Sequence, residues 1–197
     1  MKKLLLITGD LAAGKSTFSK ILSERYCTAF FQKDTFKEIL GSFIRYQGRE
    51  ENKALSDAAI ELMRHIFSKI AVTGNPVILE SNFHENELKK LHSIAEENQY
   101  EVLTIVLRGD PEILYQRYLH RMKYENRHPV HLTTTLHIRE DFLLFTEESR
   151  RETITGKNFV IDATDFSYQT DPTILKQIDL FMEEPLRCQT EICQNRS

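Results

Sequence analysis

One motif dominates this sequence: Gly9-Asp10-Leu11-Ala12-Ala13-Gly14-Lys15-Ser16-Thr17. It matches the pattern G-x-x-x-x-G-K-[ST], which is typical of a phosphate-binding loop. The mostly apolar run 3–8 before it predicts a short buried strand, and after it apolar residues recur at helical spacing, at Phe18, Ile21 and Leu22. The motif therefore lies between a strand and a helix, which is the context that a phosphate-binding loop needs.

A loop followed by a helix favours the binding of phosphate groups. The N-terminus of a helix presents unpaired backbone N–H groups and the positive end of the helix dipole. A loop with small side chains lets these groups surround a di- or triphosphate. Lys15 adds a cation for the β- and γ-phosphates, and the hydroxyl group of Ser16 is a ligand for Mg²⁺. We therefore expect the whole motif to bind a nucleotide.

Composition excludes some classes of protein. The chain has 197 residues, which suits one α/β domain with a substantial core. Its net charge of -3 and pI near 6.2 argue against a protein that binds nucleic acid mainly by electrostatics, although a local basic groove is compatible with them. No apolar run approaches the length of a membrane span, and the run 4–7 is too short for a signal peptide.

The cysteines indicate a reducing compartment. Cys27, Cys188 and Cys193 are odd in number and lack the C-x-x-C spacing of a metal or redox site. We therefore expect free thiols and a cytoplasmic protein.

Apolar runs and helical patterns alternate along the chain. Five runs predict strands, at 3–8, 28–32, 77–80, 102–107 and 159–163. Further helical patterns cover 35–45, 55–73, 88–95, 111–122, 134–150 and 172–181, with a polar break at 48–52. This alternation predicts an α/β fold, the three-layer sandwich of phosphate-loop NTPases, in which a five-stranded, mainly parallel sheet has helices on both faces.

We expect a single domain over residues 1–184, followed by a polar tail over 185–197. We expect the stretches 35–73 and 123–150 to be insertions that cover the edge of the sheet where ligands bind. The first would lie on the substrate side. The second would form a lid region, in which the polar stretch 123–132 is a mobile excursion.

Two acidic residues follow predicted strands, where open α/β sheets place their ligands. Glu80 ends the run 77–80, and an acid in this position typically helps to hold Mg²⁺. Asp34 follows the second strand, where it would face the γ-phosphate and accept the proton of an attacking hydroxyl group. Because Asp34 also precedes a helical pattern, a role as N-cap is the structural alternative.

Three arginines are candidates for contact with the nucleotide. Arg117 and Arg121 are four residues apart, so they share one face of a helix. One guanidinium can stack on adenine and the other can reach a phosphate, although a solvated basic face would have the same spacing. Arg127 lies in a segment that can close, and an arginine there would neutralise charge on the transferred phosphoryl group.

Other side chains give weaker signals. His128 and His131 have no cysteine nearby, so a hydrogen-bonding role explains them better than a metal site. Four aromatic residues can line an apolar substrate pocket, although core packing explains them more simply: Phe30, Phe31, Phe36 and Phe43.

Together these features resemble the small phosphate-loop kinase superfamily. Within it they are most similar to the ATP-binding kinase-like group, which includes polynucleotide kinase, zeta-toxin-like domains and relatives of chloramphenicol phosphotransferase. The resemblance extends from Leu4 to about Tyr168. Besides the motif it rests on five features in the same order as in the family: Lys33-Asp34, Glu80-Ser81-Asn82, Arg117-x-x-x-Arg121, Arg127-His128-Pro129 and Ile161-Asp162-Ala163-Thr164.

The resemblance implies a core that binds ATP and Mg²⁺, a lid with arginines, and a carboxylate after the second strand that acts as the base. Carried over to this sequence, Asp34 is that base. Arg117 matches the arginine that stacks on adenine, and Arg121 matches the one that contacts phosphate. Thr164 falls in the loop that approaches the adenine.

Two departures separate the chain from parts of this superfamily. Ala12 stands where many of these kinases have glycine, and its methyl group narrows the conformations open to the backbone. No clear arginine pair for a nucleoside monophosphate is present, and Arg45 and Arg49 are the nearest candidates. The second departure argues against a nucleotide as the acceptor.

The sequence therefore predicts an ATP- and Mg²⁺-dependent kinase that transfers the γ-phosphoryl group to a hydroxyl group of a small molecule. Lys15, Arg121 and Arg127 would stabilise the charge, and Asp34 would orient and deprotonate the acceptor. Two alternatives stay open: a kinase for a polynucleotide or nucleotide sugar, and a regulatory module that binds ATP without turnover. The sequence leaves the acceptor and the oligomeric state open.

Overall fold

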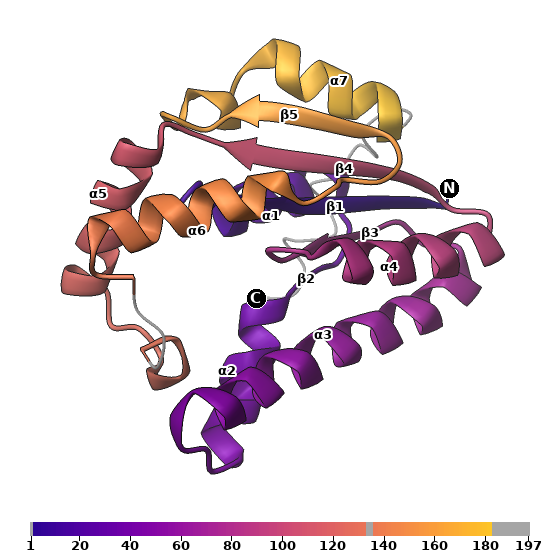
Figure 1. Ribbon diagram of the computed structural model, residues 1–197. Helices are drawn as coiled ribbons and strands as arrows, with labels where there is room; N and C mark the ends of the chain where they lie inside the picture. The colour runs from indigo at the N-terminus through magenta and orange to yellow at the C-terminus, as the bar shows by residue number, and fades with distance from the viewer. Residues whose placement is uncertain (1, 133–135, 183–197) are drawn as a thin grey trace, which may run out of the picture.

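The computed structural model describes residues 2–132 and 136–182, and its centre is one sheet of five strands (Figure 1). Their order across the sheet is β2-β3-β1-β4-β5, and each neighbouring pair is parallel. The strands are β1 (Lys3–Gly9), β2 (Phe30–Gln32), β3 (Val77–Glu80), β4 (Glu101–Arg108) and β5 (Asn158–Asp162). The predicted α/β class is confirmed, with a sheet that is parallel throughout the described strands.

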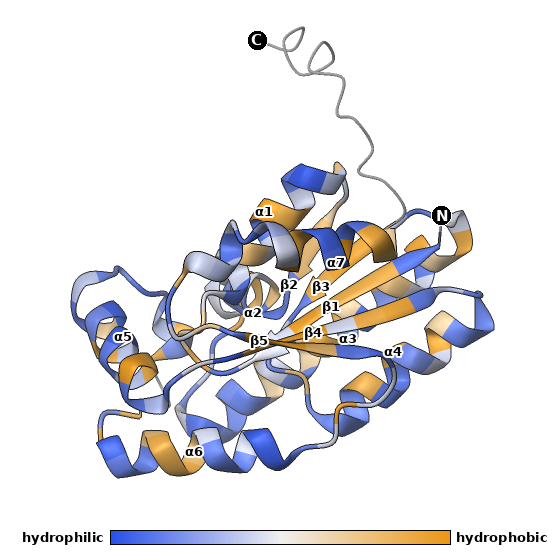
Figure 2. Ribbon diagram, turned by 90° about the horizontal axis from the view of Figure 1, so that it is seen from above, coloured by the Kyte–Doolittle hydropathy of each residue, from blue (hydrophilic) through white to orange (hydrophobic). Residues whose placement is uncertain are grey.

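In the described part of the chain, seven helices connect and cover the strands. They are α1 (Lys15–Tyr26), α2 (Lys33–Phe43), α3 (Gly48–Thr73), α4 (Glu85–Glu97), α5 (Pro111–Tyr124), α6 (Arg139–Arg151) and α7 (Pro172–Met182). Two short 3-10 helices are Pro129–His131 and Ser167–Gln169. Helices α1 and α7 cover one face of the sheet, and α3 and α4 cover the other (Figures 1 and 2). This is the predicted three-layer arrangement.

The middle strand β1 contributes to the core on both faces of the sheet. Its side chains alternate, so Leu5 and Ile7 pack with α1 and α7, whereas Leu4 and Leu6 pack with α3 and α4. All four are fully buried, and Figure 2 shows apolar residues gathered in the central strands. A parallel strand covered on both faces needs a continuous apolar sequence, which is why the run before the motif predicts it correctly.

Several predicted boundaries differ from the structure, most of all at the starts of α3 and α6. Residues 48–52, predicted as a polar break, are the first residues of α3, which starts at Gly48. Polar residues suit this position because Glu50 and Glu51 lie at the positive end of the helix dipole. The helix predicted over 134–150 starts at Arg139, and residues 133–135 lie outside the described part of the chain.

Some predictions fall on residues that the structure does not describe. The polar tail 185–197, with Cys188 and Cys193, is among them. Cys27 is an exposed free thiol, as predicted. Every helix in the described part is too short or too polar to cross a lipid bilayer.

Parallel strands place their carboxyl ends at one edge of the sheet, and the candidate residues follow these ends. The phosphate-binding motif follows β1, Asp34 follows β2, and Ser81 follows β3. Gly109 follows β4, and Ala163 follows β5. Open α/β sheets bind their ligands at this edge, so the fold brings the predicted site together.

The junction between β1 and the motif depends on Gly9. Its φ of +121° is a conformation that side chains rarely adopt, and an added Cβ would lie 2.0 Å from the carbonyl oxygen of Leu107 in β4. The next residue, Asp10, donates its backbone N–H to the same oxygen at 2.8 Å. This close approach of two backbones requires glycine.

We predict that Gly9→Ala lowers the free energy of unfolding by about 3 kcal/mol, because the methyl group adds a clash to an unfavourable φ. Urea unfolding followed by circular dichroism measures this loss. The matched control is Gly48→Ala. Gly48 also has a positive φ, +73°, but an added Cβ meets nothing within 4 Å, so we expect a loss of about 1 kcal/mol. Equal losses would show that the contact with Leu107 is unimportant.

Candidate functional site

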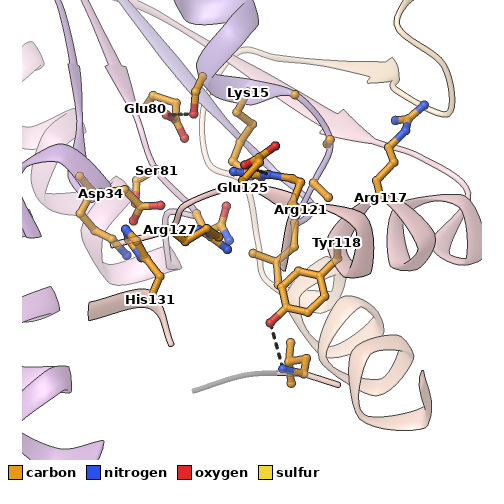
Figure 3. Close-up of a pocket in the computed structure, with 18 of the residues that line it drawn as sticks. Lys15, Asp34, Glu80, Ser81, Arg117, Tyr118, Arg121, Glu125, Arg127 and His131 are labelled. Atoms are coloured by element: carbon orange, nitrogen blue, oxygen red, sulfur yellow. Dashed lines mark hydrogen bonds and ion pairs between the residues drawn. The ribbon is translucent and has the colours of Figure 1, made fainter. Parts of the chain in front are cut away.

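A cavity of about 1180 Å³ opens at the carboxyl edge of the sheet (Figure 3). Its walls include residues 11–17, the start of α2, residues 80–82, helix α5 with the segment after it, and Phe166. Pockets for one small ligand typically have about 300–1,000 Å³, so this cavity has room for a nucleotide beside a second molecule. Most of the residues predicted to be functional line it.

The motif forms a curled loop in front of α1. Gly9, Ala12 and Gly14 have positive φ angles, +121°, +58° and +87°. Gly14 is the N-cap and no side chain caps the helix, so the first N–H groups of α1, at residues 15–17, are open to the cavity that these residues line. Such a helix start favours an anion. Ala12 keeps its left-handed backbone at a cost of about 1 kcal/mol, so the motif accommodates this departure from glycine.

Tyr168 holds the loop from its other side. Its hydroxyl group donates to the carbonyl oxygen of Ala13 at 2.8 Å, and its ring packs edge-on against Phe18, with 5.2 Å between the ring centres. Burial raises the pKa of Tyr168, so the hydroxyl group stays protonated as a donor. An added Cβ at Gly14 would lie 2.7 Å from this hydroxyl group. The loop is therefore packed as well as curled.

Lys15 lies inside the curl of the loop. Its Nζ donates to the carbonyl oxygens of Gly9 and Asp10, at 3.1 and 2.7 Å. Burial lowers the pKa of Lys15, and the carboxylates of Glu80, Asp34 and Asp10 oppose this shift. The ammonium group is thus held in a poorly solvated position beside the start of α1.

The side chains of Ser16 and Glu80 are in contact, as expected for two residues predicted to hold the same Mg²⁺ ion. The Ser16 hydroxyl group donates to Glu80 Oε2 at 3.0 Å, and the side-chain amide of Gln32 donates to the same oxygen at 2.8 Å. A hydroxyl group and a carboxylate side by side offer the oxygen ligands that Mg²⁺ prefers, so the pair fits this ion. The sequence carries no signal for this role of Gln32, because a polar residue at the end of a strand is common. Nearby, the buried hydroxyl group of Ser81 has no hydrogen-bond partner among the described residues.

Asp34 faces the cavity from α2. It is the second residue of this helix, and Gln32 takes the N-cap position. The alternative role of Asp34 as an N-cap is therefore wrong. Its carboxylate lines the cavity and opposes the lowering of the Lys15 pKa, and Figure 3 shows Asp34, Lys15 and Glu80 around the same space. This position suits a carboxylate that meets an acceptor in front of a phosphate.

Arg117 is fixed to the loop after β5. Its guanidinium donates to the carbonyl oxygens of Ala163 and Thr164, at 2.9 and 2.5 Å, and lies 4.1 Å from the centre of the Phe166 ring. Arg117 and Phe166 line the cavity, whereas Thr164 is not among the lining residues. The hydroxyl group of Thr164 instead accepts the N–H of Asp110 at 2.8 Å. Arg117 and Phe166 together offer a flat cationic and aromatic wall.

Arg121 and Arg127 reach the cavity from α5 and from the segment after it. Arg121 pairs with Glu125 at 3.2 Å, and its charge contributes to lowering the pKa of Lys15, so it lies near the motif. Arg127 contacts the sulfur of Met122 at 3.7 Å, and the described residues form no salt bridge with it. Both guanidiniums line the cavity and can turn toward a phosphate group.

The segment after α5 docks onto α2 and α3. The side chain of Val130 is fully buried there. Hydrogen bonds hold the segment, among them Asn52 Nδ2 to the Val130 carbonyl oxygen at 2.7 Å, His131 with Glu38 at 2.7 Å, and His128 with Ser42 at 3.1 Å. The hydrogen-bonding role predicted for both histidines is confirmed.

The four candidate phenylalanines do not line the cavity. Phe30, Phe31 and Phe36 pack against the core clusters on the two faces of the sheet, so core packing is confirmed for these three. Phe43 is 87% exposed near the end of α2 and belongs to neither group.

An ion pair that no sequence pattern indicated holds the motif in place. The Asp10 carboxylate is buried and accepts the N–H of Gly109 at 3.1 Å. Arg150 of α6 donates to both oxygens of this carboxylate, and also to the carbonyl oxygen of Gly109. The hydrogen bonds that Arg150 donates to Asp10 raise the pKa of Arg150, so this guanidinium stays charged. No local pattern marks Arg150, which stands in a run of charged residues.

The sequence profile of the AAA domain family matches residues 5–140. The chain belongs to the AAA domain family. The part that matches this family includes the motif, Asp34, Glu80 and the three candidate arginines. No curated protein matches the sequence.

Solved structures share the fold. A protein from Chloroflexus aurantiacus described as a candidate kinase is 24% identical, with a TM-score of 0.78 over 94% of this chain and 98% of that one. The APS kinase CysC of Mycobacterium tuberculosis, solved with AMPPNP and APS, is 12% identical, with a TM-score of 0.60 over 92% and 98%. Shikimate kinase of Bacteroides thetaiotaomicron is 15% identical, with a TM-score of 0.58 over 92% and 98%. The fold is that of the small phosphate-loop kinases, so the predicted resemblance is confirmed at this level.

We predict that Arg150→Met lowers the free energy of unfolding by about 3 kcal/mol, because it leaves the Asp10 carboxylate buried without a cation. Urea unfolding measures the loss. The matched control is Arg151→Met, because Arg151 is the next residue of α6 and pairs with Glu147 while 68% exposed. We expect little change in the control. A small change in both variants would show that the Asp10–Arg150 pair does not hold the motif.

Proposed function

We propose that this protein is an ATP- and Mg²⁺-dependent kinase that transfers the γ-phosphoryl group to a hydroxyl group of a small molecule. One observation carries the proposal: the uncapped start of α1, with Lys15, opens into the same cavity as the carboxylate of Asp34. A phosphate-binding group and a proton acceptor thus share a space large enough for two ligands. The fold supports the proposal, because shikimate kinase and APS kinase are among the proteins that have it.

The nucleotide would lie between the motif and α5. Residues 15–17 would bind its phosphates through their N–H groups and the lysine ammonium. Arg117 and Phe166 offer a flat surface for the adenine ring. Thr164 does not line the cavity, but its carbonyl oxygen accepts a hydrogen bond from Arg117 and so helps to hold this surface in place. Arg121 lies close enough to the motif to reach a phosphate.

Ser16 and Glu80 would hold Mg²⁺, with Gln32 keeping the Glu80 carboxylate in position. Bound there, the ion would neutralise charge on the β- and γ-phosphate oxygens during transfer.

Asp34 would receive the proton of the acceptor. The hydroxyl oxygen bonds to the γ-phosphorus while the bond between this phosphorus and the bridging oxygen of ADP breaks, and the hydroxyl proton passes to the Asp34 carboxylate. Lys15, Arg121 and Arg127 would stabilise the negative charge on the transferred group. The products are a phosphate ester and ADP.

We also propose that residues 1–184 form one domain, in which 35–73 contact the acceptor and 123–150 include a lid. Phe142 of α6 is fully buried against α5, so α6 would stay in place when the lid closes. A cytoplasmic location would supply the ATP that the reaction consumes, and the free thiol of Cys27 fits a reducing compartment.

We predict that the protein releases ADP from ATP and Mg²⁺ when it is given a suitable acceptor, and that Lys15→Met abolishes this release. The measurement is ADP release across a panel of sugars, hydroxy acids, antibiotics, nucleosides and oligonucleotides. Lys20→Met is the matched control, because Lys20 lies on the same helix with a side chain that is 69% exposed, and it should leave activity unchanged.

Two results of this screen would contradict the proposal. Release stimulated only by an oligonucleotide with a 5′-hydroxyl group would favour a polynucleotide kinase. Tight binding of ATP, with no ADP release in the presence of any acceptor, would favour a regulatory module that binds ATP.

We predict that Asp34→Asn lowers kcat by about 10²- to 10⁴-fold, because the amide cannot accept the acceptor's proton. The Kd for a non-hydrolysable ATP analogue should change little, since Asp34 faces the acceptor. Asp57→Asn on α3, with a side chain that is 62% exposed, is the control for the same chemical change. An unchanged kcat in Asp34→Asn would remove Asp34 from the role of base.

A further inference from the structure

Lys37 of α2 is a buried cation in the wall of the cavity. It is only 8% exposed and lines the cavity on the side of α2. Its ammonium group donates a hydrogen bond to Oδ1 of Asn52 at 2.7 Å, and within residues 2–132 and 136–182 it forms no salt bridge. Burial lowers the pKa of Lys37, Lys33 adds to the shift, and Asp34 opposes it. The Lys37 ammonium group thus lies in a poorly solvated position, which disfavours its charged form.

The contact with Asn52 does not account for a lysine at this position. An ammonium group has three donor protons, and a buried charge is unfavourable unless it is paired and fully hydrogen-bonded. Asn52 is neutral, and its other end is already fixed by a hydrogen bond to the carbonyl oxygen of Val130. A neutral side chain at position 37 could hold the same amide without the cost of burying a charge. A negatively charged ligand explains the lysine better.

The walls of the cavity carry a surplus of positive charge. Among the described residues, seven lysines and arginines line it, against four aspartates and glutamates, although the chain as a whole has a net charge of -3. Four of the seven have roles toward the nucleotide in the proposed function. The other three come from α2 and from the first turn of α3: Lys33, Lys37 and Arg49. This surplus lies on α2, which also carries Asp34, and on the start of α3.

The spacing along α2 relates Lys37 to the reacting group. Asp34 and Lys37 are three residues apart, so they lie on one face of the helix with Cβ atoms about 5–6 Å apart. A molecule whose hydroxyl group meets Asp34 can therefore place a second group, a few bonds away, at Lys37. We propose that the acceptor is a hydroxylated acid, whose carboxylate or phosphate group is bound by Lys37 with Arg49 as a second cation. This inference rests on the proposed kinase function.

Such a site selects against neutral acceptors. A neutral molecule that filled the cavity would displace water from the Lys37 ammonium without offering a negative partner. An acid instead forms charge-assisted hydrogen bonds, which are about twice as strong as neutral ones. Lys37 is thus a specificity-determining residue, while Asp34 meets the hydroxyl group itself.

The test uses matched ligands on three scaffolds, each with a neutral, a carboxylate and a phosphate form. The series are glycerol, glycerate and glycerol 3-phosphate; sorbitol, gluconate and sorbitol 6-phosphate; and inositol, quinate and inositol phosphate. Calorimetric titration in the presence of Mg²⁺ and AMPPNP measures binding without turnover, and ADP release from ATP measures turnover. We expect an acid to bind at least about 10-fold more tightly than its neutral partner. Comparing the carboxylate and phosphate forms within a series then shows which of the two groups the site binds.

Variants separate recognition of the acid from a structural role of Lys37. Lys37→Met should weaken binding of the acid by about 10- to 100-fold, with an unchanged Kd for AMPPNP. Lys37→Arg keeps the charge and should restore much of the affinity. Lys53→Met on α3, with a side chain that is 73% exposed, should have no effect. A lysine with a structural role alone would change affinity for acids and neutral ligands equally.

The outcomes distinguish this inference from the kinase function. Acid binding that depends on Lys37, without ADP release, would support the anion site and contradict the kinase. ADP release that is equal for neutral and acidic acceptors, or equal losses in Lys37→Met for both, would overturn the anion site and leave the kinase in place. Binding of none of the acids would also overturn it.

Discussion

The buried Asp10 carboxylate holds the phosphate-binding motif against the rest of the domain, and the site depends on this contact. Its oxygens accept from the N–H of Gly109 and from the guanidinium of Arg150, so α6 and the end of β4 are tied to the loop. The backbone of Asp10 adds two further links, since its N–H binds Leu107 and its carbonyl oxygen accepts from Lys15. Burying a charge costs least when a counter-ion and hydrogen bonds compensate it, as they do for Asp10. One residue therefore fixes both the loop and the lysine at its centre.

The cavity concentrates buried charge, and the partners of each charge indicate its role. Glu80 is held by Ser16 and Gln32, which fits a carboxylate kept in place for a metal ion. Lys15 and Lys37 are buried cations that bind neutral oxygens of the protein, and burial lowers the pKa of both. Charges in a poorly solvated site weaken the fold but act strongly on a charged ligand. The two lysines therefore mark the two places where we expect negative groups, the nucleotide phosphates and the acidic group of the acceptor.

Sequence patterns predicted this fold well where the cause of the structure is local. The motif is contiguous, and strands covered on both faces must be continuous apolar runs, so both could be recognised. Residues 48–52 were predicted as a break because a polar helix start resembles a loop. Asp34 was given an alternative role as N-cap because α2 starts at Lys33, two residues earlier than the predicted helix. The contact between Asp10 and Arg150 joins positions 140 residues apart, which no local pattern predicts. Lys37 had a weak signal, its spacing from Asp34, but its burial results from the packing of α2 on α3.

The central claim is that the motif binds the phosphates of ATP and directs the γ-phosphate toward Asp34. A crystal structure with AMPPNP and Mg²⁺ tests it most directly. We predict phosphate oxygens within hydrogen-bond distance of the N–H groups of residues 15–17 and of the Lys15 ammonium, at about 2.7–3.0 Å. The γ-phosphate should face the Asp34 carboxylate, with the adenine ring against Arg117. A nucleotide bound elsewhere, or no nucleotide at saturating concentration, would contradict this claim.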